Sequence, residues 1–302
     1  MSPPLRPLGR NGPPVAPVGL GFGSLGGFYG PPGTRDEKLA LLDHAYAAGL
    51  RFWDLSDVYG DAEDLVGEWL TRSGRRDDVF LGTKFSLQRD ADGRHTFRSD
   101  PEHVKASCDK SLAALGVAAI DLYYCHAVDG VTPIERTVEA MVELKNQGKI
   151  RHLGLSGVSA ATLRRAHAVH PIAALQWEYS LFTLDIESPE NNILKTCREL
   201  GVALVAFSPV GRGVLTGRAD ILKLVGGVED VARDRGSTPA QVALAWLLAQ
   251  GPDIIAIPGT KSASRMDENA GAAVLRLSGE EVQGLRDLAE RVDIKGTRYP
   301  AA

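Results

Sequence analysis

Four side chains that can handle protons stand near the ends of three short apolar runs in this 302-residue chain. They are Asp54, Tyr59, Lys84 and His126. Each follows a segment that has the composition of a buried strand in a parallel sheet. Because the carboxyl ends of such strands meet at one edge, we expect the four side chains to lie close together. A phenol, an ammonium, a carboxylate and an imidazole gathered in this way could protonate a carbonyl oxygen during a reduction.

Each of the four residue types suits a separate part of that chemistry. Tyr59 is the expected acid, but an ordinary phenol has a pKa of about 10 and releases its proton slowly near neutrality. A cation within about 4–6 Å lowers this pKa, and Lys84 is the expected cation. Asp54 would pair with Lys84, and His126 would orient the substrate oxygen through a hydrogen bond.

Each residue also has a plainer interpretation when it is taken alone. Tyr59 could anchor its loop, Lys84 could be solvated, and His126 could be a core histidine. Asp54 could cap a loop. Their shared position at strand ends favours the catalytic interpretation, because the active sites of parallel barrels lie on that face. The remaining histidines lack such a context and are interpreted as surface or helix residues.

Short apolar segments alternate with longer amphipathic ones, which predicts βα units around a parallel sheet. Eight strands are the number that closes such a barrel. The expected strands are 18–22, 50–54, 79–84, 120–125, 150–155, 173–177, 202–207 and 254–258. The expected helices are 35–48, 62–72, 102–115, 134–147, 160–170, 191–200, 239–249 and 263–270.

The two ends of the chain add elements to this repeat. The opening RPLGRNGPPVAPVG predicts a β-hairpin with its turn at Asn11-Gly12, which could plug the bottom of the barrel. A further helix is expected after Ser278. Capping residues before proline are expected at Asp100, Thr132 and Thr238. No linker divides the sequence, so residues 1–302 are predicted to form a single (β/α)8 TIM barrel domain.

Composition excludes several classes of function. A net charge of -4 and a pI near 6.0 argue against nucleic acid as a partner. No run of eighteen apolar residues could span a bilayer, and no secretion signal is present, so a cytoplasmic location is expected. Cys108, Cys125 and Cys197 are widely spaced, which suits reduced thiols. His167 and His170 have no acidic or cysteine partner at metal-ligand spacing, so no metal site is predicted.

The segment Gly21-Phe22-Gly23-Ser24-Leu25-Gly26 matches the dinucleotide fingerprint GxGxxG of a doubly wound sheet. That motif requires a helix to begin within it. Here GFYGPPG follows, which is typical of a loop. We therefore interpret the glycines as a strand-to-loop passage at the mouth of a barrel, with a doubly wound dehydrogenase as the alternative that strand order would decide.

The contexts WDLSDVYG, VFLGTKF and DLYYCHAVD resemble those of the aldo-keto reductases, and the resemblance spans nearly the whole chain. It implies reduction of an aldehyde or ketone to an alcohol with NADPH. The four residues introduced above would be the catalytic tetrad, and the partner would be a small carbonyl compound. The resemblance names neither the physiological substrate nor the oligomeric state. A cofactor-binding regulatory subunit of the same fold, similar to channel β-subunits, is the alternative from another class.

The resemblance also implies contacts with the nicotinamide half of the cofactor. Ser156 and Gln176 match the polar residues that bind the carboxamide, and Gly157 stands where the family usually has Asn or Glu. Phe207 replaces the usual tyrosine that stacks on the ring. The residues expected to line the pyrophosphate or border the cofactor at the barrel mouth are Ser208, Pro209, Val210, Gly211, Gly213, Gly23 and Ser24.

The segment IIAIPGTKSASRMDENAGA resembles the family's last strand and following helix, which hold the adenosine end. Lys261 and Arg265 would pair with a 2′-phosphate, and Glu268 and Asn269 would reach the adenine. Two cations in this place favour NADPH over NADH, with solvated surface charge as the alternative.

Three departures from the family pattern are expected to affect the substrate pocket. Trp53 and Leu55 replace the commoner Phe and Thr around Asp54, and Trp177 stands where a small residue is usual. These changes are expected to lie beside the carbonyl pocket. A long polar loop usual in the family after Gly217 is absent, since a helix-like segment follows at once. A wider pocket without a long lid is therefore expected.

Overall fold

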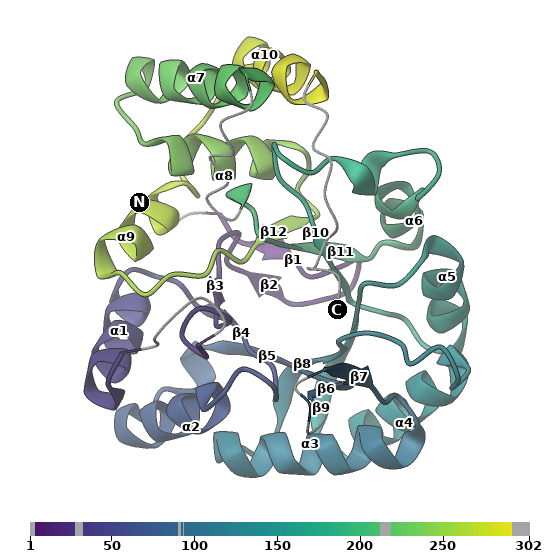
Figure 1. Cartoon of the computed structure of the whole chain (residues 1–302). Helices are drawn as coiled ribbons and strands as arrows, with labels where there is room; N and C mark the ends of the chain where they lie inside the picture. The colour runs from purple at the N-terminus through teal and green to yellow at the C-terminus, as the bar shows by residue number, and fades with distance from the viewer. Residues whose placement is uncertain (1–3, 28–32, 90–91, 93, 212–218, 292–302) are drawn as a thin grey trace.

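A ring of parallel strands lies inside a ring of helices in the computed structural model, which describes residues 4–27, 33–89, 92, 94–211 and 219–291 (Figure 1). Main-chain hydrogen bonds join the ends of the sheet: Gly19 N donates to Ala256 O at 2.8 Å, and Ala256 N to Pro17 O at 2.9 Å. The strands in their hydrogen-bonded order are β3 (Leu20–Gly21), β4 (Phe52–Asp54), β5 (Phe80–Phe85), β8 (Ile120–Cys125), β9 (Ile150–Ser156), β10 (Ala174–Glu178), β11 (Ala203–Phe207) and β12 (Ile254–Ala256). The predicted (β/α)8 fold is confirmed, and the doubly wound alternative is excluded by this order.

The eight helices whose bounds were predicted from the sequence begin and end close to those bounds. Asp100 accepts a hydrogen bond from His103 N at the start of α3, and Thr238 forms a capping box with Gln241 at the start of α8. The helices are α1 (Arg35–Ala47), α2 (Ala62–Ser73), α3 (Pro101–Leu115), α4 (Ile134–Asn146), α5 (Ala160–Val169), α6 (Ile193–Leu200), α7 (Ala219–Asp234), α8 (Pro239–Ala249), α9 (Ala263–Gly271) and α10 (Gly279–Glu290).

The expected cap at Thr132 is wrong, because another residue takes its hydrogen bonds. The Asp129 side chain accepts hydrogen bonds from Thr132 N at 2.7 Å and from Thr132 Oγ1 at 2.8 Å. Helix α4 therefore begins after Pro133 without a side-chain cap.

The N-terminal hairpin closes the amino-terminal end of the barrel. Its strands β1 (Arg6–Pro7) and β2 (Pro14–Val15) pair antiparallel. Leu8 and Val15 are buried in one cluster with Phe52, Leu122 and Ala203, which lie at or near the starts of their strands. The predicted plug at the bottom of the barrel is confirmed.

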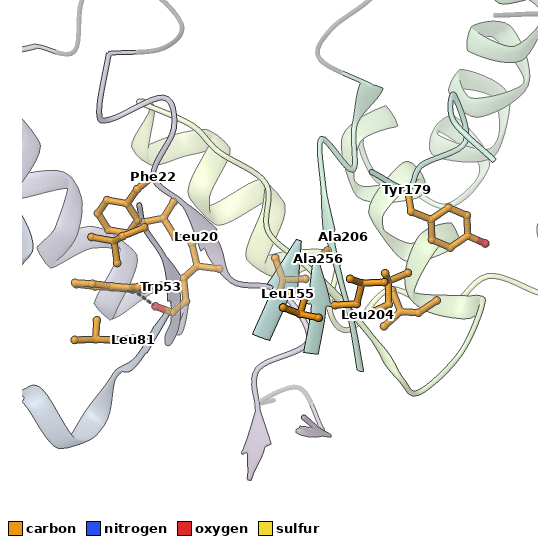
Figure 2. Close-up of a cluster of buried hydrophobic side chains, with 14 of the residues drawn as sticks. Leu20, Phe22, Trp53, Leu81, Leu155, Tyr179, Leu204, Ala206 and Ala256 are labelled. Atoms are coloured by element: carbon orange, nitrogen blue, oxygen red, sulfur yellow. Dashed lines mark hydrogen bonds between the residues drawn. The ribbon is translucent and has the colours of Figure 1, made fainter. Parts of the chain in front are cut away.

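A layer of apolar side chains fills the space between strands and helices, and Figure 2 shows part of it around Leu20 and Phe22. Trp53 belongs to this layer: its ring centroid lies 4.7 Å from that of Trp69 on α2, and its Nε1 donates to Leu50 O at 2.7 Å. Successive residues of a strand face opposite sides. The expectation that Trp53 borders the carbonyl pocket is wrong, because Asp54 faces the barrel interior and its neighbour faces the helices.

Two elements of the structure extend the simple repeat. A short hairpin of β6 (Leu87–Arg89) and β7 (His95–Phe97), which the sequence did not predict, follows β5. Helix α10, which was predicted, lies beside α7 outside the ring (Figure 1), where Arg235 forms an ion pair of 2.6 Å with Glu281. No helix among the described residues is long and apolar enough to cross a membrane.

Candidate active site

The structure brings the four predicted catalytic side chains to the carboxyl end of the barrel. Asp54 is the last residue of β4, Lys84 lies near the end of β5, and His126 directly follows β8. Tyr59 lies in the loop between β4 and α2. Strand pairing places β4 beside β5 and β5 beside β8, so the ends of the three strands are neighbours.

Lys84 and Asp54 form a buried ion pair, with exposed fractions of 0% and 2%. Lys84 Nζ donates to Asp54 Oδ1 and, at 2.6 Å, to Leu55 O. Gln176 Nε2 donates to the other carboxylate oxygen at 2.8 Å. Burial lowers the pKa of Lys84 and raises that of Asp54, while the opposite charge of each partner acts against both shifts. The pair holds the ammonium in one place.

Tyr59 is half-buried beside this ammonium. Lys84 Nζ lies 5.1 Å from the centroid of the Tyr59 ring. The ring meets the imidazole of His126 edge to face, with the centroids 6.1 Å apart and an interplanar angle of 86°. A neighbouring positive charge favours a phenolate over a phenol, which is the arrangement that the predicted role of Tyr59 as the acid requires.

The backbone of Tyr59 is held against the loop that follows β3. A Cβ atom at Gly26 would lie 2.3 Å from Tyr59 O, so only glycine fits there. At Gly21, a Cβ would lie 2.7 Å from Ile257 O, which shows the same close approach between β3 and β12. The glycines that mimic a dinucleotide fingerprint therefore allow backbones to approach each other, and one of them allows the close approach to the backbone of Tyr59.

His126 is held as a neutral imidazole. Its backbone N donates to Phe85 O at 2.9 Å, and its Nδ1 lies 3.2 Å from Ser56 Oγ. Burial, followed by the charge of Lys84, lowers the pKa of His126 to about 3. One ring nitrogen is then a donor and the other an acceptor across the physiological pH range. The contact with Ser56 was not predicted, although Ser56 lies within the WDLSDVYG segment.

The residues expected around the nicotinamide lie beside this cluster. Gln176, in the middle of β10, is paired in register with Ser156, the last residue of β9, and both are buried. Phe207 is the last residue of β11 and is half-buried. The following Ser208 has a left-handed backbone, with φ of 50°. The site brings these predicted residues together, and their roles remain predictions.

The loop expected to line the pyrophosphate is only partly described. Pro209 is buried and Val210 half-buried. Gly211 has φ of 65°, and a Cβ there would lie 2.4 Å from the Phe182 ring. Gly213 lies outside the described residues. The passage after β3 lies near the last strand, because a Cβ at Gly259 would be 3.1 Å from Ser24 Oγ, and Gly23 precedes that serine.

The start of α9 combines cations with open backbone donors. Lys261 is half-buried, Arg265 is exposed, and Arg265 makes no ion pair within the described part of the chain. Ser262, the N-cap of α9, makes no side-chain capping hydrogen bond. Glu268 is half-buried and Asn269 is buried one turn further along. A helix start with two adjacent cations is suited to hold a phosphate.

A closed barrel with a charged cluster at the carboxyl ends of its strands is the arrangement typical of barrel enzymes. The chain belongs to the aldo/keto reductase family, whose model matches residues 17–290. The aldo-keto reductase str7 of Strobilurus tenacellus is 49% identical over 92% of this chain and 91% of its own length. The NADP(+) aldo-keto reductase yakc of Schizosaccharomyces pombe is 40% identical over 99% of this chain and 95% of its own length.

Solved structures show the same relationship. A thermostable aldo-keto reductase in complex with the inhibitor epalrestat is 32% identical, with a TM-score of 0.83, over 94% of this chain and 99% of that protein. An aldo-keto reductase of Klebsiella pneumoniae in complex with NADPH is 28% identical, with a TM-score of 0.80, over 99% of each chain. The resemblance predicted from the motifs is confirmed.

Proposed function

We propose that this protein reduces an aldehyde or ketone to an alcohol with NADPH, using Tyr59 as the acid. The observation that supports this most directly is the ammonium of Lys84, fully buried between the Asp54 carboxylate and the Tyr59 ring. Because it is fully buried, this ammonium does not act as a solvent-exposed charge. The relatives whose names or complexes include NADP(+) or NADPH support the choice of cofactor.

The residues of the chain fit the two ends of such a cofactor. Lys261, Arg265 and the open helix start of α9 offer positive charge and N–H donors for a 2′-phosphate, with Glu268 and Asn269 for the adenine. Ser156, Gln176 and Phe207 would contact the nicotinamide, beside Gly23, Ser24 and residues 208–211. When bound, this cofactor supplies the hydride for the carbonyl carbon.

The tetrad would supply the proton and the orientation. A neutral His126 that carries its proton on Nε2 would donate a hydrogen bond to the carbonyl oxygen and hold it near Tyr59. As the carbonyl carbon is reduced, the oxygen gains negative charge and takes the phenolic proton, giving the alcohol and a phenolate. Lys84 stabilises that phenolate, and Asp54 keeps the ammonium in place. The phenolate then regains a proton from solvent.

A screen of NADPH oxidation tests the proposal directly. Purified protein is mixed with NADPH and a panel of aliphatic and aromatic aldehydes and ketones, and absorbance loss and alcohol formation are followed together. Stoichiometric alcohol formation with any member supports the proposal. Tight binding of NADPH without turnover across the panel would contradict it and favour the regulatory-subunit alternative.

Cofactor preference should depend on Lys261 and Arg265. Changing both to glutamine is expected to weaken NADPH binding at least tenfold, since a hydrogen bond to a charged group contributes about 1.5–3 kcal/mol. NADH lacks the 2′-phosphate, so its affinity should change little. Fluorescence titration measures both, and the matched control is Lys195→Gln with Lys223→Gln, which removes two charges from exposed positions elsewhere. Equal losses for the two cofactors would show that this pair does not bind the 2′-phosphate.

The short connection before α7 leads to a kinetic prediction. Helix α7 begins at Ala219, within a few residues of Gly211, while residues 212–218 lie outside the described residues. Lid closure limits turnover in many enzymes that have a long mobile loop. Here we expect bulky carbonyl compounds to be accepted and cofactor release to be faster than turnover. Stopped-flow fluorescence after mixing with NADPH should show a single binding phase; a slow closure phase equal to kcat would contradict this expectation.

A further inference from the structure

One polar residue, Ser56, connects the imidazole of His126 to the carboxylate of Asp57, which has no part in the proposed chemistry. Ser56 Oγ lies 3.2 Å from His126 Nδ1 and 3.3 Å from Asp57 Oδ1. Ser56 is 1% exposed, so its hydroxyl is shielded from competing water. Asp57 is half-buried, and its backbone N donates to Lys84 O at 3.2 Å. The three side chains form a line from Asp57 through Ser56 to the imidazole.

The number of hydrogens available for these hydrogen bonds links the protonation state of Asp57 to that of His126 Nδ1. Ser56 has one hydrogen to donate, and a neutral imidazole has one N–H and one bare nitrogen. If Asp57 is ionised, the serine donates to it, and His126 Nδ1–H donates to the serine. If Asp57 is protonated, it donates to Ser56, which donates to a bare Nδ1, and the imidazole proton is on Nε2.

We propose that Ser56 and Asp57 are positioning residues that set which ring nitrogen of His126 has the proton. The inference rests on the proposed function for its catalytic meaning. Nδ1 is occupied by Ser56, so Nε2 is the nitrogen left for a substrate oxygen. A protonated Asp57 places a donor there, which suits a carbonyl. An ionised Asp57 leaves a bare Nε2 there, which cannot donate a hydrogen bond to a carbonyl oxygen.

The charged and titratable groups around Asp57 come from three other elements. Glu63 on α2 is a like charge, and Lys110 on α3 and Lys84 on β5 are opposite charges. Burial, followed by the charge of Glu63, raises the pKa of Asp57 to about 7, against the lowering effects of Ser56, Lys110 and Lys84. Asp57 can therefore change its charge near neutrality.

The imidazole itself does not titrate in the same range. Burial, then the positive charges of Lys84 and His95, lowers the pKa of His126 to about 3. Tyr123 on β8 also senses Asp57, but burial raises the pKa of its phenol well above the ordinary value. Of these neighbours, Asp57 is thus the group whose charge can set the imidazole tautomer near neutral pH.

The change between the two states is balanced. Below the midpoint the line holds three mobile protons, on Asp57, on Ser56 and on His126 Nε2. Above it the line holds two, on Ser56 and on His126 Nδ1. One proton is released to solvent, and His126 remains neutral in both states. The fraction of the protein that can donate a hydrogen bond from Nε2 to a carbonyl oxygen should therefore fall as the pH rises through about 7, through a group distinct from Tyr59.

Nitrogen NMR of protein labelled in its histidine rings tests the tautomer without any turnover. His126 signals, assigned by their loss in His126→Asn, should change from the Nε2–H to the Nδ1–H pattern between about pH 5 and about pH 9. Asp57→Asn removes the titrating acid, so its tautomer ratio should not change with pH in this range. A single unchanging tautomer in the parent protein, or an unchanged transition in Asp57→Asn, would overturn the proposal.

Two further variants, together with the kinetics of Asp57→Asn, separate a positioning role from a merely structural effect. In Ser56→Ala the tautomer of His126 should no longer follow the charge of Asp57, while NADPH still binds. Lys110→Gln, at an exposed position, removes a charge that lowers the pKa of Asp57, so the NMR midpoint should move upward. The ratio of the reduction rate about two pH units above the midpoint to the rate about two units below it should be larger in Asp57→Asn than in the parent by roughly tenfold or more. The same ratio in both proteins would overturn the catalytic part of the proposal.

The outcomes also distinguish this inference from the proposed function. If no carbonyl compound is reduced but the NMR transition follows Asp57, the function fails and the coupling stands. If reduction depends on Tyr59 but the tautomer ignores Asp57, the function stands and the coupling is wrong.

Discussion

Replacement of Tyr59 by phenylalanine is expected to lower carbonyl reduction by about 10²–10⁴-fold, the range typical of a lost acid catalyst. The phenyl ring keeps the edge-to-face contact with His126, so the site should retain its shape. NADPH affinity should change little, because the residues assigned to the cofactor lie after β3 and from β9 to α9 rather than on this loop. Steady-state kcat and a fluorescence titration of NADPH measure the two effects separately.

Tyr46→Phe is the matched control for this change. It removes a phenolic hydroxyl on α1, away from the site, that donates to the Asp78 carboxylate at 2.7 Å. Its turnover should stay close to that of the parent protein. If Tyr59→Phe retains near-normal turnover, Tyr59 is not the acid, and a proton from water or His126 would have to replace it.

The sequence predicted the positions of the site residues because strand ends converge in a parallel barrel. Asp54, Lys84 and His126 needed only the assignment of three apolar strands to be placed at one end. Local chemistry also identified helix boundaries such as Asp100 and Thr238, where a short side chain precedes proline.

The errors arise where a contact joins residues that are distant in sequence or depends on the facing of a strand. Trp53 was assigned to the pocket because it is next to Asp54, yet neighbours in a strand face opposite sides. Thr132 was assigned as a cap, yet its hydroxyl donates a hydrogen bond to the Asp129 carboxylate instead. The line from Asp57 to His126 joins residues about seventy positions apart, which only the tertiary structure brings together.

The glycine-rich segment after β3 shows why a short motif needs its context. The spacing GxGxxG can arise from a helix that receives a pyrophosphate or from backbones in close contact. Gly21 and Gly26 belong to the second case, because a Cβ at either position would overlap a carbonyl oxygen. The absence of a helix start in the sequence was sufficient to favour this interpretation.

Replacement of Lys84 by methionine is expected to lower both turnover and stability. The change leaves the Asp54 carboxylate buried without its cation, while Gln176 still donates a hydrogen bond to it at 2.8 Å. Removing one partner of a buried ion pair typically lowers the free energy of unfolding by about 3–5 kcal/mol. Turnover should fall by about 10²–10⁴-fold, because the Tyr59 phenolate loses its stabilising charge. Urea denaturation and steady-state kinetics measure the two quantities.

Adding Asp54→Asn to Lys84→Met separates stability from catalysis. The neutral amide no longer requires a cation, and its oxygen can still accept the hydrogen bond from Gln176. The double variant should therefore regain most of the lost free energy of unfolding while its turnover stays as low as that of Lys84→Met. Recovery of turnover together with stability would mean that the ammonium acts only on the fold, and the assignment of Lys84 to the activation of Tyr59 would then be wrong.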